Sequence, residues 1–363
     1  MSGVDLTGEV FDSMVQPSGL TWTVIEKVER PANFSGGNRS TSYKVRSSKG
    51  RIAFLKAVDA ELFDLSHGIL VSLTACSLQH TNELKVLQHC SDRSMSKVMV
   101  PIDHIERVDV FNGTKQPVFG LIFDLAERDA RQAINESLDL DLRWAVDVMH
   151  SVCVGISQLH GGRVVHNDLK PSNILHFGQT GHKVGDLGSA TCATVGIFSI
   201  ESAGDPRYAP PELLYQATLD TDTFTAGRAA ELYLLGSLAL FMLGQPMITT
   251  SVLHHLPPEH KPRSAQNPGG WCGEFEGILP YWRSAYSKAL DEAGDSLSER
   301  LAGENLRQAI EYMGIVRELT DPSPLHRGHP RNRIGHHDRY CVKRYVSTLD
   351  RIRHRLSIRS RAS

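Results

Sequence analysis

The chain has 363 residues, of which 40% are hydrophobic and 22% charged, and its formal net charge is −2. These proportions are ordinary for a soluble globular protein and argue against extensive disorder, while the length allows one two-part unit or two ordinary domains. The six cysteines include no C-x-x-C pair, which argues against a zinc ribbon or a thioredoxin-like site and fits a reducing compartment.

The first part of the chain shows strand signals. Its N-terminus lacks a basic region followed by an apolar core, so we expect no signal peptide and a cytoplasmic protein. Turn-like stretches at Ser47–Gly50 and Asn112-Gly113 separate runs rich in β-formers, and a helical stretch that ends in Asn82–Leu87 lies between these turns. The predicted strands are Thr21–Val28, Ser42–Arg46, Arg51–Val58, Val108–Phe111 and Val118–Phe123.

After Asp124 the apolar residues follow a helical period. Positions 142, 145, 149, 152, 156 and 159 form one apolar face of a long helix. The most apolar stretch, Leu232–Ile248, holds 17 residues and is interrupted by polar residues and glycines, so we expect a buried core helix and no membrane span. A last apolar face, between Val342 and Leu356, predicts a helix that docks on the helical part.

Two short segments carry the chemistry. Residues 166–173 read His-Asn-Asp-Leu-Lys-Pro-Ser-Asn, and Asp186-Leu187-Gly188 begins 13 positions after Asn173. Together they supply two carboxylates, a lysine and an amide. Phosphoryl transfer from ATP needs these types, because a carboxylate orients the attacking hydroxyl, a cation steadies the γ-phosphate and oxygen ligands hold Mg²⁺.

These segments resemble the H-R-D-x-x-x-x-N and D-F-G motifs of the eukaryotic-type serine/threonine protein kinase family. The resemblance implies an α+β, bilobal protein-kinase fold, with a small β-rich N-lobe that carries one main helix and a larger helical C-lobe. It divides the chain into an N-terminal extension (1–19), the N-lobe (20–123), a hinge (124–130), the C-lobe (131–358) and a basic tail end (359–363). ATP and Mg²⁺ (or Mn²⁺) are the implied cofactors.

The resemblance also implies roles for N-lobe and hinge residues. Lys56, in Phe54-Leu55-Lys56-Ala57, resembles the V-A-I-K lysine and would contact the α- and β-phosphates. Its acidic partner would be Glu83, with Glu61 as second choice. Glu83 lies 27 residues after Lys56, several more than the resemblance implies, and an insertion around Ser66–Ser77 would explain the extra residues. Gly36 and Gly37 stand in a degenerate glycine-rich loop, and the backbone of Asp124 and Ala126 would bind adenine at the hinge.

In the catalytic loop, Asp168 would accept the proton of the substrate hydroxyl and Lys170 would neutralise the γ-phosphate. Asn173 and Asp186 would hold the metal ion, while His166 and Gly188 would be structural. Lys170-Pro171 resembles serine/threonine kinases rather than tyrosine kinases.

Later motifs complete the resemblance, with departures. Glu212 closes a segment similar to G-T-x-x-Y-x-A-P-E and would form a buried ion pair with Arg327. Glu231 replaces the Asp that caps the catalytic-loop backbone in the family, and we expect this longer side chain to do so less well. Asn167 replaces the usual Arg, which suggests activity independent of a phosphorylated activation loop. Asp205 stands where the family has Thr, which leaves the substrate preference open.

We therefore expect an ATP-dependent protein kinase that acts on Ser or Thr hydroxyls of protein substrates. Two alternatives stay open: a non-catalytic kinase-like module, and a small-molecule kinase of the aminoglycoside or choline type, which shares His-x-Asp-x-x-x-x-Asn. Whether the protein phosphorylates itself stays open, with candidate hydroxyls at Ser189, Thr191, Thr194, Ser199 and Ser202.

Charge is uneven along the chain. Residues 1–325 carry a net charge of −11, whereas residues 326–363 hold 11 Lys and Arg against 2 acids, a net +9. The basic segment either binds an acidic partner or turns its arginines toward water and the chain's own acidic body. Only Tyr340 and Tyr345 interrupt it with aromatic rings, so nucleic-acid binding is unlikely.

Overall fold

The computed structural model describes residues 5–16, 19–29, 40–58, 69–111, 114–137, 139–197, 207–217, 219–334 and 337–359. Several sequence-based assignments lie outside these residues: the loop glycines Gly36 and Gly37, the second-choice acid Glu61, the Asn112-Gly113 turn, Asp205, and the hydroxyls of Ser199 and Ser202.

The first part of the described chain is a six-stranded sheet in the order β1-β2-β3-β4-β6-β5. Along the central strand β4, buried and partly exposed side chains alternate strictly. Ala53, Leu55 and Ala57 are therefore buried in the small core, while Lys56 lies on the opposite face of the sheet. The strands are β1 (Val10–Asp12), β2 (Thr21–Lys27), β3 (Ser40–Ser47), β4 (Ile52–Val58), β5 (Asp103–Phe111) and β6 (Thr114–Asp124).

Residues assigned to an N-terminal extension contribute to this sheet. β1 pairs antiparallel with β2, and Phe11 lies opposite Trp22 in its register. Both side chains are buried, together with Leu6, in the core of the small lobe. Residues on both sides of the boundary predicted at residue 19 therefore pack into the same hydrophobic core.

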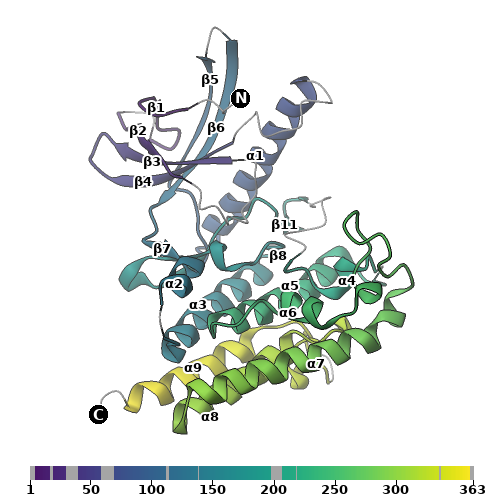
Figure 1. Cartoon of the computed structure of the whole chain (residues 1–363). Helices are drawn as coiled ribbons and strands as arrows, with labels where there is room; N and C mark the ends of the chain where they lie inside the picture. Colours follow the sequence, from purple (N-terminus) through teal and green to yellow (C-terminus); the bar gives the residue numbers. More distant parts are fainter. Residues whose placement is uncertain are drawn as a thin grey trace.

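The helix beside the sheet is longer than predicted. α1 (Ile69–Asp92) has 24 residues and lies next to the sheet (Figure 1). Most of the stretch around Ser66–Ser77, which was predicted to be an insertion before the helix, is thus part of the helix itself. The additional residues lengthen α1 at its N-terminal end and leave Glu83 in its second half.

The second part is helical and has its own, larger core, in which α3 and α5 are central. The predicted apolar faces become α3 and α9, and α5 is buried along most of its C-terminal half. The described helices of this part are α2 (Ala130–Glu136), α3 (Leu142–Gly161), α4 (Pro211–Leu214), α5 (Thr223–Met242), α6 (Ile248–His255), α7 (Phe275–Arg300), α8 (Gly303–Leu319) and α9 (Lys343–Arg359). None of the helices in the described ranges is both long and apolar enough to cross a membrane.

The last helix brings its arginines to acids of the same chain. α9 packs against α3 and α8 at the base of the helical part (Figure 1). Arg351 and Arg355 both pair with Glu311 of α8, at 2.5 and 2.8 Å. Part of the basic C-terminal segment is thus already neutralised by the acidic body.

Two small sheets lie where the sheet part meets the helical part. β7 (Arg128–Asp129), β9 (Ile174–His176) and β10 (His182–Val184) form one, and β8 (Val164–Val165) pairs with β11 (Thr191–Cys192) in the other. The loops after β8 and β10 carry Asp168 and Asp186. The prediction of a bilobal α+β fold is confirmed.

Candidate active site

A lysine and two carboxylates meet between the two parts. Nζ of Lys56, on β4, lies 2.8 Å from Oε1 of Glu83 on α1 and 2.7 Å from Oδ1 of Asp186 after β10. The Lys56 and Glu83 side chains are 18% and 4% exposed, so water screens this contact poorly. The structure thus joins the sheet, α1 and the helical part through one ammonium group.

The charged groups of this cluster shift one another's pKa values. Burial alone would lower the pKa of Lys56, but the carboxylates of Asp186 and Glu83 outweigh it and raise that pKa above its ordinary value. For Asp186 the signs are reversed: burial alone would raise its pKa. The cations Lys56 and Lys170 outweigh burial and hold the pKa of Asp186 well below its usual range. Lys56 therefore stays an ammonium and Asp186 a carboxylate at neutral pH.

The catalytic-loop residues form a second cluster. Nζ of Lys170 donates to Oδ2 of Asp168 at 2.6 Å. Nδ2 of Asn173 donates to the backbone oxygen of Asp168 at 2.8 Å and to its Oδ2 at 3.3 Å. Both contacts with described side chains fall on Oδ2 of Asp168 and neither on Oδ1.

Two residues of these loops have left-handed backbones. Asn167 has φ of 65° and Asp186 has φ of 62°, a region that Asn and Asp tolerate better than most residues. Asn167 Nδ2 donates to the backbone oxygen of Ser189 at 3.0 Å and to Oγ1 of Thr191 at 2.9 Å. His166 Nε2 contacts the backbone oxygen of Gly185 at 2.8 Å, so both side chains tie the catalytic loop to the loop of Asp186.

Glu231 caps the catalytic loop in spite of its length. Its Oε1 accepts the N–H groups of His166 at 2.6 Å and Asn167 at 3.3 Å. Its Oε2 contacts Nε2 of His160 at 2.5 Å. Burial raises the pKa of the carboxyl, but the hydrogen bond from His160 and the neighbouring His166 outweigh this and lower it. The expectation that Glu would serve less well finds no support in these contacts.

His160 is a residue that sequence reasoning missed. It lies in the last turn of α3, where a histidine is an ordinary helix-end residue. Its partner Glu231 is 71 residues away, so the pattern along the chain gives no signal of the contact.

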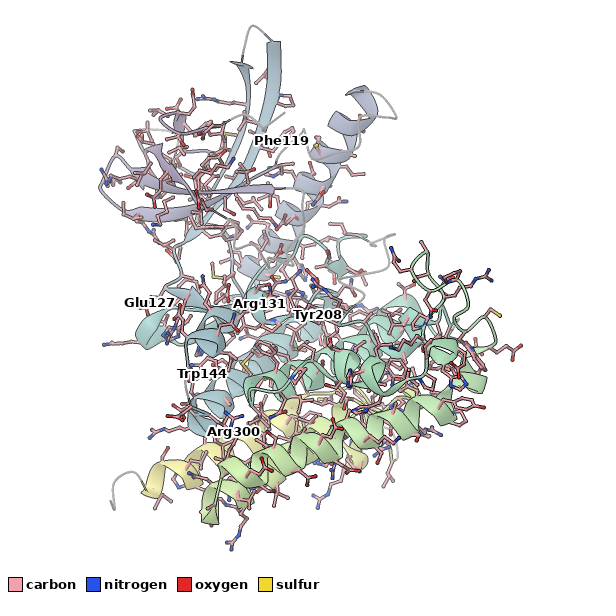
Figure 2. The ribbon with its side chains drawn as sticks, viewed as in Figure 1. Phe119, Glu127, Arg131, Trp144, Tyr208 and Arg300 are labelled. Carbon is pink, nitrogen blue, oxygen red and sulfur yellow. The ribbon has the colours of Figure 1, made fainter. Side chains whose placement is uncertain are left out.

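A buried ion pair joins two distant segments of the helical part. Arg327 Nη1 and Nη2 donate to the two carboxylate oxygens of Glu212 at 2.5 and 2.6 Å. Before Glu212, the hydroxyl of Tyr208 accepts a hydrogen bond from Arg131 of α2 at 3.3 Å, and both residues lie on the side of the helical part that faces the sheet (Figure 2).

The predicted hinge joins the two parts. β6 ends at Asp124, whose side chain forms an ion pair with Arg51, the residue before β4. Phe123 is buried at 8% exposure, and Glu127, shortly after, donates its N–H to His176 of β9. Asp124 and Ala126 therefore lie at and just after the end of β6, in the segment that leads to α2 and contains Glu127 (Figure 2).

The donor set fits a hard divalent cation. Asn173 uses its nitrogen for the contact with Asp168, and its side-chain oxygen, which accepts only a long hydrogen bond of 3.5 Å from Ser172 among the described residues, can act as a ligand; Asp186 is an ionised carboxylate. Mg²⁺ prefers such oxygens and keeps waters or phosphate oxygens as its other ligands. Among the described residues there is no group of three or more His, Cys, Asp or Glu side chains that would form an all-protein metal site.

Comparison with known proteins decides the family. The model of the protein kinase domain matches residues 36–253, more than half of the chain. This chain belongs to the protein kinase domain family.

Relatives of the kinase are distant. A probable cell division protein kinase from Encephalitozoon cuniculi is 25% identical over 174 residues, 48% of this chain and 50% of its own length. Mitogen-activated protein kinase 4 of Oryza sativa subsp. japonica is 27% identical over 215 residues, 58% of this chain and 50% of its own. The chain spans about half the length of these relatives. The kinase also resembles the serine/threonine-protein kinase fused of Drosophila melanogaster, at 26% identity over 242 residues, 65% of this chain and 28% of that protein.

Proposed function

We propose that this kinase transfers the γ-phosphate of ATP to Ser or Thr hydroxyls of protein substrates. The observation that carries the proposal is the contact of Lys56 with both Glu83 and Asp186, at 2.8 and 2.7 Å. It brings a strand lysine, a helix glutamate and a loop aspartate from three distant parts of the chain to the cluster that contains Asp168 and Asn173. All the side-chain types that phosphoryl transfer needs are then in one place.

The proposed reaction assigns one task to each group. The acceptor hydroxyl oxygen forms a bond to the γ-phosphorus, the bond from that phosphorus to the β,γ-bridging oxygen breaks, and ADP leaves. The hydroxyl proton passes to Asp168, whose Oδ1 would receive it, because Oδ2 already contacts Lys170 and Asn173. Lys170, 2.6 Å from Asp168, is placed to offset the charge of the transferring phosphoryl group, and Lys56 holds the α- and β-phosphates.

Asn173 and Asp186 would hold Mg²⁺ or Mn²⁺, which when bound would neutralise charge on the phosphates. The low pKa of Asp186 supports this role, because a carboxyl that stays ionised keeps its affinity for the ion at neutral pH.

The choice of Ser or Thr in a protein rests on sequence features. Lys170-Pro171 follows the serine/threonine pattern, and the Tyr208–Glu212 segment, with the Arg327 ion pair beneath it, distinguishes protein kinases from small-molecule kinases. Relatives that are named as mitogen-activated or serine/threonine kinases support the same choice.

Regulation follows from Asn167. Its amide holds the backbone of Ser189 and the hydroxyl of Thr191 without any phosphate. Thr191 is buried at 4% exposure, whereas Thr194 is exposed, so Thr194 is the better described candidate for self-phosphorylation. The proposal is therefore that basal activity needs no modification of this segment.

Purified protein incubated with γ-labelled ATP and Mg²⁺ tests the proposal. The acceptors are a generic basic protein and, separately, hydroxylated small molecules such as an aminoglycoside and choline. Labelled phosphoserine or phosphothreonine is the expected result. Nucleotide binding without transfer would instead identify a non-catalytic module, and label only on a small molecule would identify a small-molecule kinase.

A further inference from the structure

A chain of polar contacts links the C-terminal segment to the catalytic loop. Asp338 Oδ2 accepts from Nη2 of Arg228 at 2.6 Å, and Nε of Arg228 lies 3.4 Å from Nδ1 of His160. His160 Nε2 is 2.5 Å from Glu231, which in turn holds the N–H groups of His166 and Asn167. We call Asp338, Arg228, His160 and Glu231 the polar chain.

The polar chain determines where the proton of His160 sits. The guanidinium of Arg228 can only donate, so Nδ1 of His160 must accept and its proton lies on Nε2. That N–H then points at Oε2 of Glu231, and Oε1 remains for the two backbone N–H groups. In His160, Nδ1 is thus an acceptor and Nε2 a donor, and both oxygens of Glu231 are acceptors.

Arg228 is well placed to impose this arrangement. It is 110 residues from Asp338 in sequence, its side chain is only 12% exposed, and its guanidinium lies 5.5 Å from the ring centre of Phe224 and 6.0 Å from that of Tyr340. Its fork uses Nε for His160 and Nη2 for Asp338 at the same time, which a lysine ammonium at the end of a flexible stem cannot reproduce.

Asp338 is held in turn by the backbone before α9. Its Oδ1 accepts the N–H of Tyr340 at 3.2 Å, and its backbone oxygen accepts the N–H of Cys341 at 3.1 Å. The carboxylate is therefore fixed by a local turn although its side chain is 52% exposed. The outer end of the polar chain is a rigid anchor.

The length of Glu231 explains why such an anchor is useful. A glutamate has one more rotatable bond than the aspartate usual in the family, and holding it in one conformer costs side-chain entropy. We propose that Arg228 and Asp338 are positioning residues: they orient His160, which fixes the Glu231 carboxylate against the catalytic loop just before Asp168. The effect on catalysis rests on the proposed function, whereas the effect on the loop backbone does not.

Amide hydrogen exchange at His166 and Asn167, resolved by fragmentation mass spectrometry, tests the inference without any need for activity. The variants are Arg228→Lys, which keeps the charge and loses the fork, and Asp338→Asn, which changes an exposed anchor and so preserves the fold. The matched control is Asp350→Asn, because Asp350 is an exposed acid of α9 whose partner Arg353 lies outside the polar chain.

Loss of one hydrogen bond predicts exchange at these two amides about threefold to tenfold faster in Arg228→Lys, and a smaller increase of the same sign in Asp338→Asn. Exchange within α8 should not change, and neither should any amide in Asp350→Asn. In the transfer assay, kcat should be lower in the variants whose exchange is faster, while the KM for ATP stays within about twofold of wild type.

Unchanged exchange at both amides in both variants overturns the inference. So does an increase of similar size in α8, because that would indicate general destabilisation. If the wild-type protein transfers no phosphate, the proposed function fails, and the exchange data still decide the inference about the loop.

Discussion

The buried pair of Glu212 and Arg327 provides a quantitative test of the fold. Their side chains are 1% and 0% exposed, and the guanidinium also donates to the backbone oxygens of Asp321, Ala229 and Pro322. Arg327→Met removes the cation and leaves the Glu212 carboxylate buried without a counter-charge.

Removing one partner of a buried ion pair costs about 3–5 kcal/mol. This lowers the folding equilibrium constant by roughly two to four orders of magnitude. The double variant Arg327→Met with Glu212→Gln no longer buries a charge, so it should recover about 1–3 kcal/mol of that loss. The control is Arg307→Met, since Arg307 is 78% exposed and pairs with Glu304 one turn away; it should change stability by less than about 0.5 kcal/mol.

Urea unfolding followed by tryptophan fluorescence measures all four free energies, because changes in midpoint at a constant slope report stability. A loss below about 1 kcal/mol in Arg327→Met, or a double variant no more stable than the single one, would refute the reasoning.

Three further predictions concern the site and its surroundings. Lys56→Met should abolish phosphate transfer while the protein stays folded at about 25 °C, as measured by transfer and by circular dichroism; its free energy of unfolding should fall, because Glu83 and Asp186 lose their shared counter-charge. Asn167→Ala should lower kcat about threefold to tenfold with or without prior phosphatase treatment, because a neutral amide makes the contact; a loss that appears only after dephosphorylation would contradict this. Burial and nearby cations lower the pKa of His182 to about 4, so the unfolded chain binds a proton first as pH falls. Stability should then drop by about 3 kcal/mol between pH 7 and 4. His182→Gln should flatten that slope and the exposed His254→Gln should not.

Much of the architecture follows from local patterns. The predicted strand at Arg51–Val58 appears in the structure as β4, and the helical spacing from Leu142 to Leu159 specifies both an element and its buried face and appears as α3. The spacing of Asp168, Asn173 and Asp186 places three oxygen-bearing side chains on two adjacent loops. These features are readable because the residues that determine them are neighbours in sequence.

What could not be predicted depends on distant residues. β1 has only three residues, too few for a period, and its place is decided by the burial of Phe11 against the sheet. α1 as a whole has no strong apolar face, so the sequence pattern did not indicate where the helix begins. The contact of His160 with Glu231 and that of Arg228 with Asp338 join residues 71 and 110 positions apart. Only tertiary packing brings such pairs together.

The most direct test of the central claim compares binding and transfer in one variant, Asp168→Asn. Isothermal titration should give a Kd for ATP in the presence of Mg²⁺ within about threefold of wild type, because Lys56, Asn173 and Asp186 still hold the nucleotide. Transfer at saturating ATP should fall by at least about a hundredfold, because the proton acceptor is lost. Transfer at the wild-type rate would contradict the account.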